Sequence, residues 1–198
     1  MNPPLSSIEA FILVGGASRR LGRDKALLSL DGKLFIDRIA EALKLVSNRV
    51  RLVGSRQASS GESYENVPDR NPGWGALGGV ETALAASESE WAAIVACDLP
   101  FVTGELMTRM ASWRQNFDTV VPVQTDGRQQ PLCALYRRDP CAELAQQLVK
   151  EGARRPRDLL TLVTTRWVAP TELADLAGAE RFFHNVNTPE DYTRAMVR

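Results

Sequence analysis

The sequence has little histidine and cysteine, which restricts the chemistry that it can carry. His184 is the only histidine among 198 residues, so a Ser-His-Asp triad or a zinc site with several histidines is hard to build. The three cysteines, Cys97, Cys133 and Cys141, form no C-x-x-C pair and are odd in number. This favours buried thiols in a reducing compartment over disulfides or a metal site. Any bound metal should be a hard cation with oxygen ligands, which points to Mg²⁺.

The sequence also lacks a surplus of charge and a long apolar run. Lys plus Arg and Asp plus Glu both number 24, so the formal net charge is zero. Broad binding to nucleic-acid phosphates depends on a surplus of basic residues, so no nucleic-acid partner is expected. No apolar run is long enough to span a bilayer, and residues 1–4 lack the charged head of a signal peptide. These absences predict a cytoplasmic protein with no membrane partner.

Short apolar runs alternate with helical patterns along the whole chain. Strands are predicted at residues 10–14, 50–53, 91–97, 119–123, 132–136 and 164–168, and helices near 36–46, 77–86, 103–113 and 140–150, after Pro156 and after Thr188. Continuous apolar runs are typical of strands buried on both faces. We therefore predict an α/β fold with a single Rossmann-like, three-layer domain over residues 1–198. A mostly parallel sheet should carry helices on both faces.

Small and acidic residues fall where the predicted strands end. Gly15, Gly54, Asp69 and Asp98 each lie at an expected carboxyl end. Ligands of open parallel sheets bind beyond the carboxyl ends of the strands. We therefore expect these residues to line one crevice.

A glycine-rich loop follows the first predicted strand, and residues 13–25 read L-V-G-G-A-S-R-R-L-G-R-D-K. Glycines let the backbone approach a polyphosphate and turn its N–H groups inward. Arg20 and Lys25 can supply the positive charge that phosphoryl oxygens need. The loop is not a Walker A motif, because Lys25 does not directly follow Gly22, and it does not fit the dinucleotide fingerprint of redox enzymes. A solvated basic turn is the alternative interpretation.

Acidic and amide side chains supply further candidates. Asp98 ends a buried strand, where a carboxylate is costly unless it is paired or binds a cation, although it could also cap the next turn. Asp69 starts a turn-rich stretch and could form an ordinary Asx-turn. Asn185 and Asn187 are two residues apart, so in an extended segment their amides point the same way and can bind a polar heterocycle or phosphate. The alternative interpretation, which the pattern favours less, is that they build the turn before the last helix, for which Thr188 is the expected cap.

These segments, in this order, resemble the signatures of the molybdenum cofactor guanylyltransferases, the MobA family of nucleotidyltransferases. The loop is similar to L-A-G-G-x-S-x-R-M-G-x-D-K, residues 96–101 to A-C-D-x-P-F, and residues 185–191 to N-x-N-T-P-E-D. The stretch from Asp69 to Gly79 resembles the family's D…G-P-L-A-G region, with Ala76 for Pro and Gly78 for Ala. Residues 127–136 resemble G-R-x-x-P-L-x-A-L-Y, a strand and loop expected to face the acceptor. The resemblance covers nearly the whole chain.

The resemblance implies transfer of GMP from Mg-GTP to the phosphate of molybdenum-loaded molybdopterin, giving molybdopterin guanine dinucleotide and pyrophosphate. It implies that the N-terminal half binds the nucleotide and the C-terminal half binds the acceptor. The implied catalytic residues are Arg20, Lys25 and Asp98, with Asp98 as the Mg²⁺ ligand. The implied nucleotide-binding residues are Leu13, Val14, Gly15, Gly16, Gly22, Lys25, Asp69, Gly79 and Asp98, and the implied acceptor-binding residues are Asn185 and Asn187.

Other functions remain open at the level of the sequence. A related transferase could use CTP, or a sugar phosphate as acceptor, and a regulator could bind the nucleotide without turnover. A molybdoenzyme or a chaperone is a possible recipient of the product. Arg154 and Arg155 match a basic position on the acceptor side, or they form a solvated turn.

Overall fold

The computed structural model describes residues 7–14, 28–54 and 64–196, and their strands form a seven-stranded sheet and a two-stranded sheet. The order of the larger sheet is β5-β4-β1-β6-β8-β7-β9. The strands are β1 (Ile8–Leu13), β2 (Ser29–Leu30), β3 (Lys33–Leu34), β4 (Val50–Val53), β5 (Glu65–Val67), β6 (Trp91–Ala96), β7 (Thr119–Pro122), β8 (Cys133–Arg137) and β9 (Thr165–Val168). The helices are α1 (Phe35–Lys44), α2 (Gly75–Ala86), α3 (Gly104–Ser112), α4 (Arg138–Lys150), α5 (Pro156–Leu160), a 3-10 turn at Pro170–Glu172 and α6 (Pro189–Met196).

Most neighbouring strands of the large sheet run parallel. β1 is parallel to both β4 and β6, β4 to β5, and β7 to β9. β8 is antiparallel to both of its neighbours, β6 and β7. The prediction of a mostly parallel sheet is confirmed. Because β8 runs against β6, the loop that enters β8 lies at the edge of the sheet where β6 ends.

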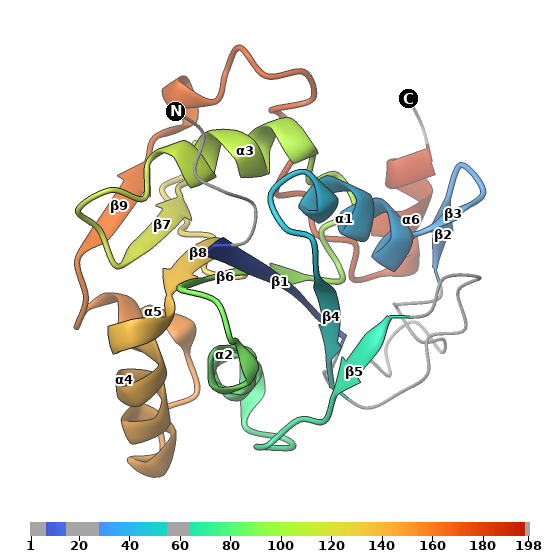
Figure 1. The fold of residues 1–198 in the computed structure, drawn as a ribbon. Helices are drawn as coiled ribbons and strands as arrows, with labels where there is room; N and C mark the ends of the chain where they lie inside the picture. Colours follow the sequence, from blue (N-terminus) through green and yellow to red (C-terminus); the bar gives the residue numbers. More distant parts are fainter. Residues whose placement is uncertain (1–6, 15–27, 55–63, 197–198) are drawn as a thin grey trace.

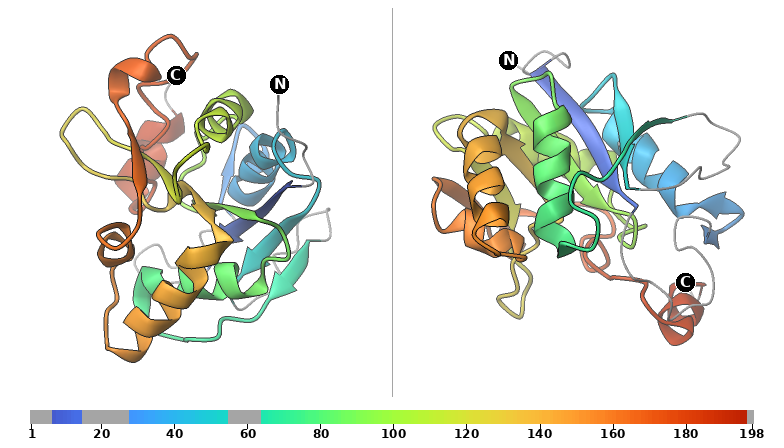
Figure 2. Two further views of the ribbon diagram at one scale, coloured as in Figure 1. Left: turned by 60° about the vertical axis from the view of Figure 1, so that its left-hand side comes forward. Right: turned by 90° about the horizontal axis from the view of Figure 1, so that it is seen from below.

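Helices cover both faces of the sheet, which gives the predicted three layers (Figure 1). α1 and α3 lie on one face, and α2, α4 and α5 lie on the other. Along β1, Ala10 and Ile12 pack toward α1 and α3, whereas Phe11 and Leu13 pack toward α2. Successive side chains of a strand point to opposite faces, so a strand covered on both sides must be apolar throughout. Figure 2 shows α2 and α4 side by side under the sheet.

α6 packs away from both faces, against the small β2–β3 hairpin. Leu28, Leu30, Phe35 and Val186 form a buried cluster, and Tyr192 of α6 packs against it. The Tyr192 hydroxyl donates to the backbone carbonyl of Ser29 over 2.5 Å. The C-terminal helix is therefore attached to the chain segment that follows residue 27.

The predicted start of α6 is confirmed as a reciprocal cap. The Asp191 N–H donates to Thr188 Oγ1 over 3.1 Å, and the Thr188 N–H donates to Asp191 Oδ2 over 3.0 Å. Hydrogen bonds from the Asn187 N–H and from Thr188 lower the pKa of the Asp191 carboxyl group. This geometry satisfies N–H groups that the first turn of the helix leaves without an intrahelical partner.

Four elements were not predicted, because their sequences carry no periodic apolar pattern. β2 and β3 have two residues each, and the 3-10 turn has three. β5 is an edge strand in which Val67 alone is buried. The predicted helix start at Pro140 agrees with the non-helical backbone of Asp139 inside α4.

The cysteines agree with the prediction of buried thiols. Cys97, Cys133 and Cys141 are buried and form no disulfide. Burial raises the pKa of the Cys133 and Cys141 thiols to about 12, so both stay protonated and unreactive at neutral pH. In the described ranges, none of the helices combines the length and apolar character needed to cross a membrane.

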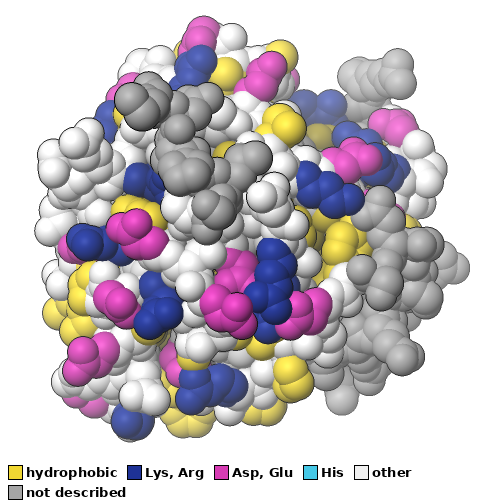
Figure 3. Space-filling model, viewed as in Figure 1, with side chains coloured by type: hydrophobic (Ala, Val, Ile, Leu, Met, Phe, Trp, Pro, Cys, Tyr) yellow, Lys and Arg dark blue, Asp and Glu magenta, His cyan; other side chains and the backbone are white. Residues whose placement is uncertain are grey.

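Charged residues form a network at the amino edge of the sheet. Glu9 is 2% exposed, and its Oε1 accepts a hydrogen bond from Arg51 Nη1 over 3.1 Å. Arg51 Nη1 also donates to the Ala86 carbonyl over 2.8 Å, and Arg51 Nη2 lies 2.7 Å from Glu65 Oε1. The N–H of Glu88 donates to Glu9 Oε2 over 2.8 Å. On the face shown in Figure 3, acidic and basic side chains lie interspersed, in line with the zero net charge.

We predict that Glu9→Ala lowers the free energy of unfolding by about 3 kcal/mol, because it removes the buried one of the two carboxylates that pair with the buried Arg51 guanidinium. Urea denaturation followed by circular dichroism measures this change. Glu88→Ala is the matched control: its side chain is 77% exposed, and we expect a loss of about 0.5 kcal/mol or less. Equal losses in the two variants would contradict the role assigned to the buried pair.

Candidate functional site

The carboxyl ends of the central strands are held in register by backbone hydrogen bonds. The Val14 N–H donates to the Val53 carbonyl over 2.9 Å, and the Cys97 N–H donates to the Leu13 carbonyl over 3.1 Å. The Gly54 N–H donates to the Val67 carbonyl over 3.1 Å. Residues just past β1, β4 and β6 are therefore fixed along one edge, as the expected crevice requires.

Asp98 follows β6 at this edge and touches a segment far away in the sequence. Its backbone carbonyl accepts a hydrogen bond from the Val186 N–H over 2.9 Å. Its Oδ2 lies 3.5 Å from Nδ2 of Asn185, across a separation of 87 residues. The structure thus brings together the predicted metal ligand and one of the two predicted acceptor-binding residues. The Asp98 side chain is half-buried.

A cavity of about 770 Å³ opens beside this contact. Both predicted acceptor-binding asparagines, Asn185 and Asn187, line it. The other lining residues come from the loop after Asp98, the β7–β8 connection and the C-terminal segment; they are Phe101, Gln124, Arg128, Arg181, Phe183, His184, Val186, Asp191, Arg194 and Ala195. A volume of this size suits a small-molecule ligand rather than a single ion.

The loop that enters β8 borders the same cavity. The Gln124 N–H donates to the Arg128 carbonyl over 2.8 Å, which closes the turn. Gln124 Nε2 donates to the Phe183 carbonyl over 3.5 Å and so connects the turn to the C-terminal segment. The predicted strand and loop over residues 127–136 agree with this arrangement, and that the loop faces the acceptor stays a prediction. Gln130 is buried, and its N–H donates to the Pro122 carbonyl over 2.9 Å.

Asp69 lies two residues after β5 and forms the Asx-turn that the sequence allowed. Its Oδ1 accepts hydrogen bonds from the Asn71 N–H over 2.9 Å and from the Thr82 hydroxyl over 3.3 Å. These bonds fix the Asp69 carboxylate against α2. Its contact with a nucleotide stays a prediction.

Sequence reasoning missed Glu81, which holds the loop after Asp69. Glu81 is 3% exposed, and its Oε2 accepts a hydrogen bond from Asn71 Nδ2 over 2.6 Å. Its Oε1 lies 3.2 Å from Arg70 Nη1. The available signal was an acidic residue inside the otherwise apolar α2 segment, since buried carboxylates need partners.

Trp74 attaches the same loop to the turn between α4 and α5. Its Nε1 donates to the Ala153 carbonyl over 3.0 Å, and the Arg154 guanidinium lies 4.9 Å from the centre of its ring. The Leu77 N–H donates to the Arg154 carbonyl over 3.2 Å. Arg154 therefore packs on an aromatic ring, which the sequence did not indicate, and both Arg154 and Arg155 are exposed.

Gly78 and Gly79 let α2 approach its neighbours closely. A Cβ at Gly78 would lie 2.9 Å from the Cβ of Trp74 and 3.1 Å from the Cβ of Asn71. A Cβ at Gly79 would lie 3.3 Å from Cδ1 of Leu13. Gly78 thus faces the loop of Trp74, and Gly79 faces the end of β1.

Several predicted site residues lie outside the described residues. They are Gly15, Gly16, Arg20, Gly22 and Lys25, from the glycine-rich loop. The described residues that flank the loop are Val14, at the end of β1, and Leu28, in the cluster beneath α6. The roles of the five residues stay predictions from the sequence.

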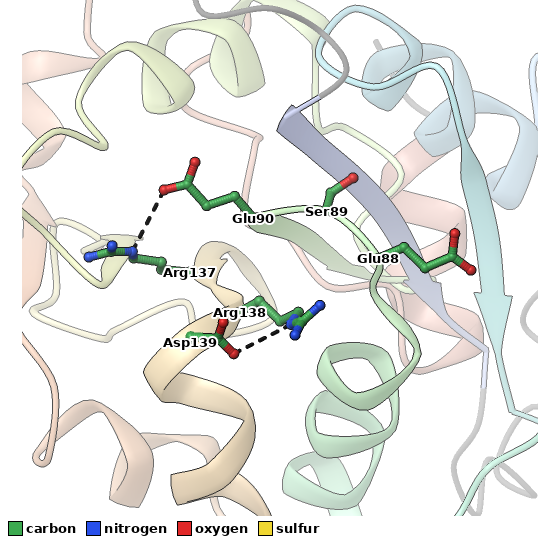
Figure 4. Close-up of a pocket in the computed structure, with 6 residues that line it drawn as sticks. All are labelled: Glu88, Ser89, Glu90, Arg137, Arg138 and Asp139. Carbon is green, nitrogen blue, oxygen red and sulfur yellow. Dashed lines mark hydrogen bonds and ion pairs between the residues drawn. The ribbon is translucent and has the colours of Figure 1, made fainter.

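A second hollow, of about 240 Å³, lies at the opposite edge of the sheet (Figure 4). Its charged side chains pair with one another: Arg137 Nε lies 3.7 Å from Glu90 Oε1, and Arg138 Nε lies 3.4 Å from Asp139 Oδ1. This neutralisation makes it a weaker candidate than the cavity beside Asp98. Across residues 7–14, 28–54 and 64–196, no three His, Cys, Asp or Glu side chains gather to hold a metal.

Comparison with known proteins gives consistent results. A family model described as "MobA-like NTP transferase domain" matches residues 10–166. A probable molybdenum cofactor guanylyltransferase of Pelotomaculum thermopropionicum is 34% identical over 187 residues, covering 94% of this chain and 90% of the relative. A second probable molybdenum cofactor guanylyltransferase, from Carboxydothermus hydrogenoformans, is 30% identical and covers 97% and 96%. The crystal structure of molybdopterin-guanine dinucleotide biosynthesis protein A from Archaeoglobus fulgidus superposes with a TM-score of 0.80, at 25% identity, over 95% and 96% of the two chains.

We predict that Gly78→Ala destabilises the protein by about 1–2 kcal/mol, because the new Cβ would overlap the Trp74 loop. Gly79→Ala is the matched control. Its Cβ meets the end of the flexible Leu13 side chain, and alanine favours the helix by up to about 1 kcal/mol, so we expect stability to be unchanged or slightly higher. Chemical denaturation of both variants measures the difference, and an equal effect at the two positions would contradict the packing described.

Proposed function

The chain belongs to the MobA-like NTP transferase family, and on this premise we propose that it transfers GMP from Mg-GTP to the phosphate of molybdenum-loaded molybdopterin. The products are molybdopterin guanine dinucleotide and pyrophosphate. The names of the relatives that align over nearly their whole length support GTP and molybdopterin as the substrates. The N-terminal half of the chain would bind the nucleotide, and the C-terminal half the acceptor.

The contact between Asp98 and the Asn185–Val186 segment is the observation on which this proposal rests. Asp98 lies two residues after β6, and β6 pairs with β1, the strand that leads into the glycine-rich loop. Asn185 lines the cavity at the acceptor side. Nucleotidyl transfer needs two bound substrates whose reacting groups meet at one point. The 3.5 Å distance between the two side chains supports that meeting point.

In the proposed reaction, an oxygen of the acceptor phosphate attacks the α-phosphorus of GTP. A new P–O bond forms there, the bond from the α-phosphorus to the bridging oxygen breaks, and pyrophosphate leaves with that oxygen and its electron pair. The acceptor phosphate is already a nucleophile, so the protein needs no covalent residue and no general base. Positioning and charge stabilisation then carry the catalysis. Arg20 and Lys25 would neutralise negative charge on the triphosphate.

The residues at the end of β6 suit a hard divalent cation. Asp98 presents carboxylate oxygens at the edge of the sheet where the nucleotide is expected, next to the amide of Asn185. Magnesium in proteins is commonly held by one or two carboxylates, with phosphates and water as its other ligands. Asp98 would supply the protein ligand. When bound, the ion would supply positive charge that stabilises the negative phosphates.

The alternatives raised by the sequence are not favoured. A CTP-dependent transferase and a transferase for sugar phosphates share the fold, but the full-length relatives are named guanylyltransferases. A regulator without turnover would not require Arg20, Lys25 and Asp98 together. The proposed place of action is the cytoplasm, with which three buried, unbridged cysteines agree. A molybdoenzyme or a chaperone would receive the product.

We predict that Lys25→Ala and Asp98→Ala each lower the rate of pyrophosphate release on the order of a hundredfold, because the first removes a positive charge beside the triphosphate and the second removes the proposed magnesium ligand. An enzyme-coupled pyrophosphate assay with saturating substrates measures the rate. Lys150→Ala, an exposed change on α4, is the control and should be fully active. Circular dichroism should show the same fold in all variants. Full activity of either site variant would overturn the role assigned to it.

Incubation with magnesium, molybdenum-loaded molybdopterin and each of the four nucleoside triphosphates in turn tests the donor. We expect the dinucleotide to form with GTP and not with CTP, and mass spectrometry of the product measures it. Formation of the cytosine dinucleotide alone would overturn the proposed donor and leave the family assignment intact.

A further inference from the structure

The cavity beside Asp98 contains an arginine whose setting differs from that of its neighbours. Three arginines line the cavity: Arg128, Arg181 and Arg194. Arg128 Nη2 lies 3.1 Å from Asp126 Oδ2, and Arg194 Nη2 lies 3.3 Å from Asp191 Oδ1. Within the part of the chain that the structure describes, Arg181 makes no ion pair with a carboxylate.

The Arg181 side chain is nevertheless held in place. Its guanidinium carbon lies 4.0 Å from the centre of the Phe101 ring, a short cation–π distance. Its Nη2 donates to the Ala195 carbonyl over 3.2 Å. A guanidinium carries five N–H donors, and this carbonyl occupies one of them. Arg181 is half-buried, so its position is fixed by an aromatic face and a helix carbonyl rather than by a counter-charge.

The elements that hold Arg181 also form the candidate site. Phe101 is three residues after Asp98, and Phe101, Asn185 and Asn187 line the same cavity as Arg181. Arg181 is four residues before Asn185. The guanidinium therefore belongs to the acceptor side of the site and comes from a different segment than Arg20 and Lys25.

We infer that Arg181 binds the phosphate of the acceptor and thereby sets the affinity for an anionic acceptor. This inference rests on the proposed function. Two anions must approach each other in the reaction, and their repulsion is weakened when each has its own cation. A pre-positioned guanidinium binds phosphate oxygens through two parallel hydrogen bonds and loses little side-chain entropy on binding. Arg20 and Lys25 would bind the phosphates of the donor, and Arg181 would bind the phosphate of the acceptor.

Arg181→Gln removes the charge and keeps an amide N–H donor on a shorter side chain. We expect KM for molybdopterin to rise about tenfold, as for the loss of one charge-assisted hydrogen bond, while KM for GTP stays unchanged. Arg181→Lys keeps the charge without the planar fork and should fall between wild type and Arg181→Gln. KM for molybdopterin should also increase less steeply with ionic strength in Arg181→Gln than in wild type.

Arg138→Gln is the matched control, because it removes one arginine charge at the opposite edge of the sheet (Figure 4). Both KM values should equal those of the wild type. Thermal denaturation of all variants shows whether α6 stays in place. An unchanged KM for molybdopterin in Arg181→Gln overturns the inference. A parallel rise of both KM values, or a lysine variant as weak as the glutamine variant, also overturns it and indicates a structural role for Arg181.

A binding experiment separates this inference from the proposed function. Molybdopterin is titrated into wild type and Arg181→Gln without GTP, and its fluorescence reports binding. If wild type produces no dinucleotide with GTP, the proposed function fails. The titration still decides the role of Arg181: a weaker affinity in the glutamine variant supports it, and equal affinities overturn it.

Discussion

The hydrogen bond from the Val186 N–H to the Asp98 carbonyl connects the end of β6 to the C-terminal segment, and the candidate site depends on it. Without this bond, the sheet would still present Asp98 at its edge. The bond adds Asn185 beside the Asp98 carboxylate and closes one side of the 770 Å³ cavity. A backbone hydrogen bond is suited to this task because it fixes the segment without using a side chain.

The reversed direction of β8 has a comparable effect on the other side of the cavity. In a fully parallel sheet, the loop entering a strand lies at the amino edge, away from the ligand site. Because β8 is antiparallel to β6 and β7, its entering loop is at the carboxyl edge instead. Arg128 and Gln124 therefore line the cavity beside the C-terminal segment. Because β8 is reversed, the loop that enters it lines one side of the cavity, and no loop after a parallel strand is needed there.

Local patterns predicted most of the elements, since the apolar run of β1 and the helical spacing of α1 reflect burial directly. They could not predict the direction of β8, because a run such as Cys133 to Tyr136 is apolar whichever way it runs. The roles of Asp98 and Asn185 were predicted from sequence motifs and the family resemblance. Their contact with each other could be seen only in the three-dimensional structure. Glu81 and Arg181 were missed because the chain fold, and not a sequence pattern, brings them next to their partners, Asn71 and Phe101. No spacing rule marks such single residues.

The link between Asp98 and Val186 also bears on how the protein is made. Ribosomes synthesise a chain from its N-terminus, and the first part can fold while the rest is still being added. A nascent chain that ends before residue 182 already contains every strand of the large sheet. It lacks Asn185, Val186 and α6, so the cavity beside Asp98 has only part of its lining. Assembly of the candidate site therefore waits for residues that are synthesised after every strand of the large sheet, and a chain terminated before residue 182 would lack part of the cavity beside Asp98.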